Sequence, residues 1–207
     1  MNNDYEFQIT DEQGLLLVKM ARMALEKYQS EGTCITVEAD QDLGRRFGVF
    51  VTLYYVDKSN KFALRGCIGY PLPNDSLVRS LVNASIKAAN EDPRFSPVSY
   101  NELREILIEV SILSPPMLIS AENIKSKILI GKHGLIIEGS SGSGLLLPNV
   151  ASENGWDTIQ FLEQLCHKAG LPSNAWMYPN IRLYSFESII FRETKPGGQI
   201  VRMKKTL

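Results

Sequence analysis

Leu64-Arg65-Gly66-Cys67-Ile68-Gly69-Tyr70 is the stretch around which the fold can be worked out. It follows an apolar run, Gly48–Val56, across the polar turn Asp57–Lys61, and this pattern is typical of a β-hairpin. Side chains alternate between the two faces of a strand. The alternation predicts two sets, with Phe62, Leu64, Gly66 and Ile68 on one face and Ala63, Arg65, Cys67 and Gly69 on the other. Arg65 and Cys67 should therefore stand side by side.

Arg65 and Cys67 are candidate functional residues, because a guanidinium beside a thiol favours the thiolate. Gly66 and Gly69 flank Cys67, and glycine inside a strand often marks the close approach of a ligand or of another backbone segment. The residues fit a structural interpretation equally well. Cys67 would then be a small core residue and Arg65 a paired structural charge.

The segments after the hairpin offer further groups for the same site. Asn74 or Asp75 can cap a helix over residues 75–90, and the free N–H groups at its start would favour an anion. The two prolines of Asp92-Pro93-Arg94-Phe95-Ser96-Pro97 exclude regular structure there. Arg94 either points toward the pocket of Arg65 or pairs locally with Asp92. Glu109, on a strand near 105–113, is a candidate partner for Arg65.

The remaining periodicity predicts an α+β fold with a largely antiparallel sheet and flanking helices. Further helices are expected over 11–31, with a capping box from Thr10 and Gln13, and over 157–169, capped by Asp157. Strands are expected near 47–56, 62–69, 105–113 and 181–191. The glycine-bearing segments 131–134, which holds His133, and 139–144 are interpreted as hairpin turns, because neither has the spacing of a phosphate loop.

Several of these motifs together resemble the AMMECR-type domain family, also called AmmeMemoRadiSam system protein A. The similar segments are LRGCIGY at 64–70, DPRFSP at 92–97, SILSPP at 111–116 and GLLLP at 144–148, in this order and over most of the chain. The resemblance implies one domain over residues 1–207, with two unequal lobes of which the larger is built from both ends of the chain. It also implies, in some organisms, partnership with a Memo-like protein and a radical S-adenosylmethionine enzyme.

Composition narrows the class of function. A net charge of −1 over 207 residues gives no general argument for binding nucleic acid or a membrane surface. Three widely spaced cysteines argue against a disulfide scaffold, and the sequence begins without a signal-peptide pattern, so we expect a cytoplasmic protein. With two histidines and no Cys-x-x-Cys motif, the chain offers no metal-ligand set, and we expect neither metal nor cofactor.

Two hypotheses from different classes follow. In the first, the protein is a cysteine-dependent enzyme or a modification-site protein. Cys67 is the nucleophile, His133 its base, and Arg65 or Arg94 holds an anion beside the bared backbone of Gly66 and Gly69. In the second, it is a non-catalytic interaction module for a protein or RNA partner. We favour a pocket around Arg65 and Cys67 that binds or modifies an anionic small molecule or macromolecule, and we expect Cys67 to be the most reactive thiol and Cys166 the least reactive.

Overall fold

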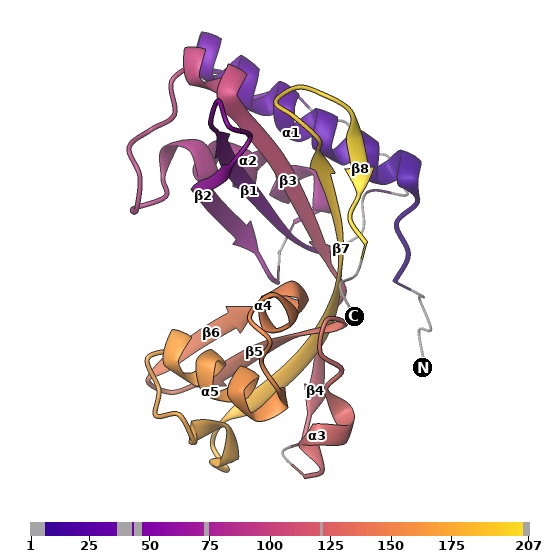
Figure 1. Ribbon diagram of the computed structural model, residues 1–207, viewed down its shortest axis with the longest axis vertical. Coiled ribbons are helices and arrows are strands. Elements are labelled where there is room, and N and C mark those ends of the chain that lie inside the picture. The colour runs from indigo at the N-terminus through magenta and orange to yellow at the C-terminus, as the bar shows by residue number, and fades with distance from the viewer. Residues whose placement is uncertain (1–6, 37–42, 44–46, 73–74, 121, 205–207) are drawn as a thin grey trace. The chain divides into compact units, whose positions relative to one another are not determined.

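The computed structural model of the chain describes residues 7–36, 43, 47–72, 75–120 and 122–204. Within these residues eight strands are joined by pairing in the order β2-β1-β3-β7-β5-β6, and β4 and β8 also pair with β7 (Figure 1). The helices are α1 (Asp11–Glu31), α2 (Leu77–Asn90), α3 (Ile124–Lys127), α4 (Pro148–Glu153) and α5 (Thr158–Lys168), with the short 3-10 helices η1 (Asn101–Glu105) and η2 (Ala175–Met177). The strands are β1 (Gly48–Val56), β2 (Phe62–Tyr70), β3 (Ile106–Leu113), β4 (Met117–Ile119), β5 (His133–Gly139), β6 (Gly142–Leu146), β7 (Arg182–Glu193) and β8 (Ile200–Arg202). The predicted α+β class is confirmed.

The chain divides into two compact units, as the resemblance implied. The first contains the described residues up to Leu113 together with Ile189–Met203, so it is built from both ends of the chain. The second, smaller unit consists mainly of Ser114–Ser188. Strand β7 contributes to both units, because its first part pairs with β4 and β5 and its last part pairs with β8.

The core of the first unit lies between the sheet and two helices. Val49, Val51 and Leu53 of β1 are fully buried on the face that α1 and α2 cover (Figure 1). Ala84 and Ala88 on α2 are also buried, and such small side chains let the helix lie close to β1 and β2. This close packing determines where the residues after α2 meet strand β2.

Local signals placed the helix boundaries. Thr10 and Gln13 form the predicted capping box of α1, and Gly32 ends the helix at a φ of 70°. Asp157 caps α5 in the same way. The helix predicted over 75–90 is α2, but the suggested cap Asp75 was wrong, because the N-cap is Ser76, whose hydroxyl accepts the N–H of Arg79. The other suggested cap, Asn74, lies outside the described residues.

A β-bulge changes the predicted alternation along β2. Leu64 pairs with Tyr54 and Gly66 pairs with Leu53, so Arg65 is an extra residue in β2. Because Leu53 and Tyr54 are successive residues of one strand, their partners Leu64 and Gly66 face opposite sides of the sheet. The predicted grouping of Leu64 with Gly66 on one face was therefore wrong.

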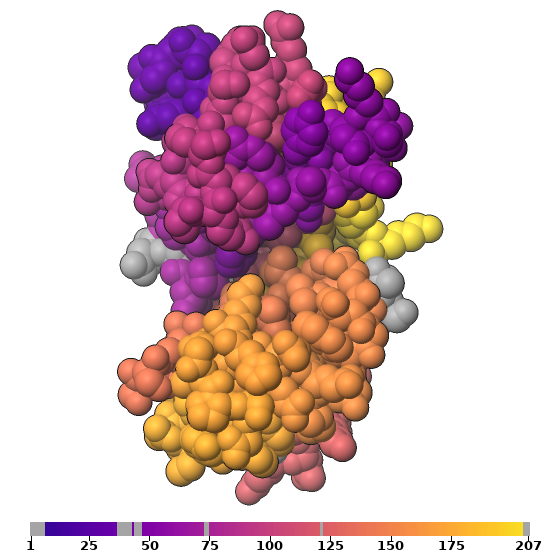
Figure 2. Space-filling view, turned by 60° about the vertical axis from the view of Figure 1, so that its left-hand side comes forward, coloured from indigo at the N-terminus to yellow at the C-terminus, as the bar shows by residue number. Residues whose placement is uncertain are grey.

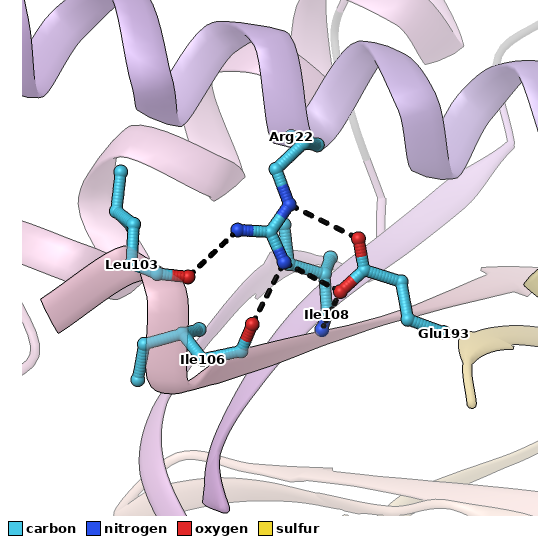
Figure 3. Close-up of polar contacts among 5 residues, drawn as sticks. All are labelled: Arg22, Leu103, Ile106, Ile108 and Glu193. Carbon is cyan, nitrogen blue, oxygen red and sulfur yellow. Dashed lines mark hydrogen bonds and ion pairs between the residues drawn. The ribbon is translucent and has the colours of Figure 1, made fainter. Parts of the chain in front are cut away.

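A buried ion pair joins the two ends of the chain in the first unit (Figure 3). Arg22 of α1 donates from Nε and Nη2 to the carboxylate of Glu193, whose side chain is 3% exposed. Nη1 of Arg22 donates to the carbonyl oxygen of Leu103, Nη2 donates also to that of Ile106, and the N–H of Ile108 donates to Glu193. The pair thus satisfies backbone groups around the start of β3, where unpaired groups would cost stability.

The second unit has its own core, formed where α5 packs on β5 and β6. The predicted turn over 139–144 joins β5 to β6 as an antiparallel hairpin. The segment 131–134 is a turn that leads from α3 into β5, rather than a hairpin between successive strands, and there the N–H of His133 donates to the Leu129 carbonyl. Among the described residues, no helix is long and apolar enough to cross a membrane.

Candidate functional site

Asp92 connects the hairpin signature to the loop that follows α2. Its Oδ2 atom accepts the backbone N–H of Cys67 at 2.8 Å and Nη2 of Arg94 at 2.7 Å. Its Oδ1 atom accepts Nε and the backbone N–H of Arg94. Figure 2 shows that the purple surface of the β1–β2 hairpin and the pink surface of the segment after α2 adjoin. Arg94 therefore pairs locally with Asp92, the second of the two interpretations of Arg94, and Asp92 also binds the backbone of Cys67.

The electrostatics of this contact follow mainly from the hydrogen bond between Arg94 and Asp92, two residues of very different burial. The Asp92 side chain is 3% exposed, whereas that of Arg94 is 53% exposed. The hydrogen bond from Arg94 holds the pKa of Asp92 well below its ordinary value, although burial acts in the opposite direction. The same hydrogen bond raises the pKa of Arg94, and the nearby Cys67 makes a smaller contribution. The pair is therefore ionised at neutral pH, with the arginine at the surface.

Arg65 lies in the same region but is held by a different carboxylate. Its Nε and Nη2 atoms donate to Glu102 of η1 at 2.6 and 3.2 Å. The ring of Phe95 lies 5.8 Å from the Arg65 guanidinium carbon and 5.4 Å from that of Arg94, so both cations contact one aromatic side chain. Nη1 of Arg65 is buried and has no hydrogen-bond partner among the described residues.

The predicted pairing of Arg65 with Glu109 was wrong, because β1 lies between β2 and β3. Glu109 instead contacts the Tyr54 hydroxyl and Arg192. In the sheet, Glu109 of β3 lies opposite Thr52 of β1. On the other side of β1, Thr52 lies opposite Cys67 of β2. The Thr52 hydroxyl donates to the Cys67 sulfur at 3.3 Å, and this contact was not anticipated from the sequence.

Close packing against other parts of the chain explains why residues 66 and 69 of the signature are glycines. A Cβ atom on Gly66 would lie 2.1 Å from the carbonyl oxygen of Ala88, at the end of α2. A Cβ atom on Gly69 would lie 2.3 Å from the ring of Phe50. Both glycines thus allow close approach of other parts of the same chain, which is the second of the two meanings that glycine in a strand can have.

The C-terminal end of α2, and not its N-terminal end, lies next to the signature strand. Gly66 touches Ala88, and Asp92 lies two residues beyond the last residue of α2. A helix of 14 residues is about 21 Å long, so the N-terminus of α2 is separated from this contact by the length of the helix. The predicted combination of the signature with the helix N-terminus was therefore wrong, and the positive charge near Cys67 comes from arginine.

The other predicted residues have separate surroundings. His133 lies half-buried on β5 of the second unit, and its Nδ1 atom accepts the N–H of Leu129 at 3.2 Å. Its role as a base for Cys67 stays a prediction. Cys166 is buried in the core of the second unit, and burial raises the pKa of its thiol. Cys34 is exposed and lines a hollow of about 280 Å³ with Asp75 and Arg79.

Two further hollows lie away from the signature. One, of about 310 Å³, is lined by Arg22, Glu26, Tyr100, Leu103, Arg104, Pro196 and Gly197. The other, of about 470 Å³, lies between β4 and η2 and is mainly apolar, with Trp176 and Tyr178 in its wall. Among the described residues, no three His, Cys, Asp or Glu side chains gather where they could hold a metal ion.

Comparison with known proteins identifies the family of the chain. The AMMECR1 family model matches residues 18–191. The chain belongs to the AMMECR1 family. A Thermococcus gammatolerans protein is 46% identical over 200 residues, which cover 95% of this chain and 98% of the relative. A Methanopyrus kandleri protein, MK0488, is 45% identical over 93% of this chain and 94% of its own length.

A solved structure supports the fold of this AMMECR1 family member. The crystal structure of PH0010 from Pyrococcus horikoshii superposes with a TM-score of 0.87 at 43% sequence identity, covering 95% of this chain and 99% of that one. PH0010 is described as an uncharacterized protein.

The geometry of the site suits a thiol that acts beside a fixed positive charge. The Thr52 hydroxyl can stabilise a thiolate at Cys67, since a donor to the charged form favours it. Arg94 is oriented by two bonds to Asp92, and half of its side chain faces solvent. Arg65 is half-buried and carries an ion pair of its own, so its first role is to join β2 to η1.

Proposed function

We propose that this AMMECR1-family protein binds an anionic group at Arg94 and holds it beside the thiol of Cys67, which reacts with the bound molecule. The observation that carries the proposal is the shared acceptor Asp92 Oδ2, because Cys67 N and Arg94 Nη2 both donate to it. A carboxylate thus fixes the position of the guanidinium relative to the residue that bears the thiol.

The two arginines have different parts in this proposal. Arg65 uses Nε and Nη2 on Glu102 and supports the local fold. Arg94 uses Nε and Nη2 on Asp92, and its Nη1 atom has no hydrogen bond to the described residues. Guanidinium groups bind carboxylates and phosphates with good geometry. Because Asp92 already balances the charge of Arg94, the expected affinity for a simple anion is modest.

Thermal melting in the presence of anions tests the binding half of the proposal. Phosphate, citrate and ATP are added at constant ionic strength to wild type and to Arg94→Gln, Cys67→Ser and Arg79→Gln. Arg79 is a matched control because it forms an exposed pair with Asp75 at 3.8 Å on α2. At least one anion should raise the Tm of wild type, Cys67→Ser and Arg79→Gln, and should raise that of Arg94→Gln less. An equal shift in all four proteins, or none in wild type, would contradict the proposal.

The reaction half is tested separately. In Cys67→Ser the anion contacts of Arg94 stay in place, so a bound ligand should still raise the Tm while covalent modification is lost. A non-catalytic interaction module makes a different prediction, since its partner would bind both proteins and leave Cys67 unmodified. Mass spectrometry of the wild-type protein after incubation with the ligand distinguishes these two cases.

A further inference from the structure

We infer that Cys67 undergoes thiol–disulfide exchange with a small disulfide that carries carboxylates, rather than acyl transfer. This inference rests on the proposed function and adds to it the class of reaction and the class of substrate. It is drawn from what surrounds the backbone and the sulfur of Cys67.

The group bound to the backbone of Cys67 disfavours acyl transfer. Attack of a thiolate on a carbonyl forms an oxyanion, which enzymes stabilise with N–H donors, commonly including that of the nucleophile itself. The N–H of Cys67 already donates to Asp92 at 2.8 Å. Arg94 keeps this acceptor ionised, so a negative charge lies where an oxyanion would need donors. An oxyanion formed next to this carboxylate would be repelled.

Thiol–disulfide exchange requires no such donors. The Cys67 thiol loses its proton to solvent, and the thiolate attacks one sulfur of the disulfide. A new S–S bond forms to Cys67 as the old S–S bond breaks, and the second half of the disulfide leaves as a thiolate that takes a proton from solvent. Two electrons move between sulfurs and no other oxidant is needed. The Thr52 hydroxyl, 3.3 Å from the Cys67 sulfur, is a donor to the attacking thiolate.

Arg94 selects the charge of the partner. Its guanidinium lies over Phe95 at 5.4 Å and its side chain is 53% exposed, so an incoming molecule can reach it. A carboxylate on the disulfide can bind the guanidinium while a sulfur approaches Cys67. A cationic disulfide would be repelled by the same group.

The other two cysteines do not supply a resolving thiol. Cys166 is fully buried in the core of the second unit. Cys34 lines a hollow with Asp75 and Arg79 at the beginning of α2, whereas Cys67 meets the residues that follow the end of that helix. The disulfide formed at Cys67 therefore joins the protein to an external molecule, and an external thiol must release it.

The test compares three disulfides on the whole protein: oxidised glutathione, which carries carboxylates, neutral 2-hydroxyethyl disulfide and cationic cystamine. The rate of mixed-disulfide formation at each cysteine is measured by peptide mass spectrometry. At Cys67, oxidised glutathione should react faster than cystamine by about fivefold, the size of effect expected of a half-exposed charge. Exposed Cys34 in the same sample is the internal control and should show a smaller preference.

Variants and an acyl donor complete the test. Arg94→Gln should remove the preference for oxidised glutathione and Arg94→Lys should keep it, with circular dichroism to verify folding of both. Treatment with 4-nitrophenyl acetate should acylate Cys67 no faster than Cys34. Faster acylation of Cys67 than of Cys34, or an equal rate for all three disulfides at Cys67, would overturn the inference. Anion-dependent Tm shifts that depend on Arg94 would survive either result, so failure here is distinct from failure of the proposed function.

Discussion

Asp92 accepts the backbone N–H of Cys67 at 2.8 Å, although the two residues are 25 positions apart in the sequence. The bond joins the hairpin signature to the loop after α2 and, through Arg94, places a cation at the same point. Structural and chemical roles thus coincide in one carboxylate. The consequences for stability can be measured without knowing the substrate.

Replacement of Asp92 by Asn should destabilise the protein. Asn keeps one acceptor oxygen but loses the charge that binds the N–H of Cys67 and the guanidinium of Arg94. The side chain at position 92 is also buried. Loss of hydrogen bonds to a charged group predicts a decrease of ~1–3 kcal/mol in the free energy of unfolding, measured by urea denaturation. Asp75→Asn is the control, because Asp75 pairs with Arg79 at the surface, and it should change stability by less than about 0.5 kcal/mol. Equal effects of the two substitutions would show that the Asp92 contacts contribute little.

The contribution of Asp92 should also depend on pH. The pKa of Asp92 is lowered in the folded protein, mainly by the hydrogen bond from Arg94. Its extra stability is therefore complete above the unfolded-state pKa, about 3.9, and is lost as the pH falls toward the folded-state pKa. The difference in unfolding free energy between wild type and Asp92→Asn should shrink as the pH decreases from about 5 to about 2. Subtracting the variant removes the effect of the other carboxylates, and a difference that grows on acidification would refute this sign.

Breaking the Arg22–Glu193 pair should cost more than breaking a surface pair. Glu193→Gln leaves the Arg22 guanidinium, 12% exposed, without its counter-charge, and a buried ion pair that loses one partner costs ~3–5 kcal/mol. Asp11→Asn removes the exposed pair with Arg202 and should cost less than about 1 kcal/mol. Chemical denaturation gives both values. In a double-mutant cycle, Arg22→Met with Glu193→Gln should cost less than the two single changes combined, and strict additivity would argue against direct coupling.

Gly66→Ala tests whether the glycine serves packing. The added methyl group would meet the Ala88 carbonyl oxygen at 2.1 Å, so strand or helix must move, at a cost of about 2–3 kcal/mol. Gly32→Ala is a useful comparison, because its φ of 70° is unfavourable but the space around it is open, and it should cost about 1 kcal/mol. Differential scanning calorimetry orders the two. A Gly66→Ala variant as stable as wild type would mean that α2 can withdraw from the strand freely.

The parts of the fold that depend on neighbouring residues could be predicted from the sequence. The capping box of α1 and the Asp157 cap of α5 depend on side chains close together in the sequence, and both were predicted correctly. Arg22 could have been found as well. It lies four residues after Val18 and three before Leu25, on the buried face of α1, and a charge on such a face requires a partner.

The parts of the site that depend on strand order could not be predicted from the sequence. The bulge at Arg65 arises from how β2 pairs with β1, and nothing in the β2 sequence alone shows an extra residue. Pairing Arg65 with Glu109 required β2 and β3 to be neighbours, but β1 separates them. Glu102 had one local signal, because Ser99 precedes it by three residues and the two form reciprocal bonds typical of a capping box. Thr52 had none, since its contact with Cys67 depends on register.

The most direct test of the central claim is the ratio of alkylation rates with iodoacetate and iodoacetamide at each cysteine, measured by mass spectrometry at neutral pH. The two reagents place the same reactive carbon on an anion and on a neutral amide. If Arg94 holds anions beside Cys67, the iodoacetate-to-iodoacetamide ratio should be higher at Cys67 than at exposed Cys34, and Arg94→Gln should bring the two ratios together. Cys166, whose pKa burial raises, should react slowest with both reagents. Equal ratios at Cys67 and Cys34 in the wild-type protein would contradict the account.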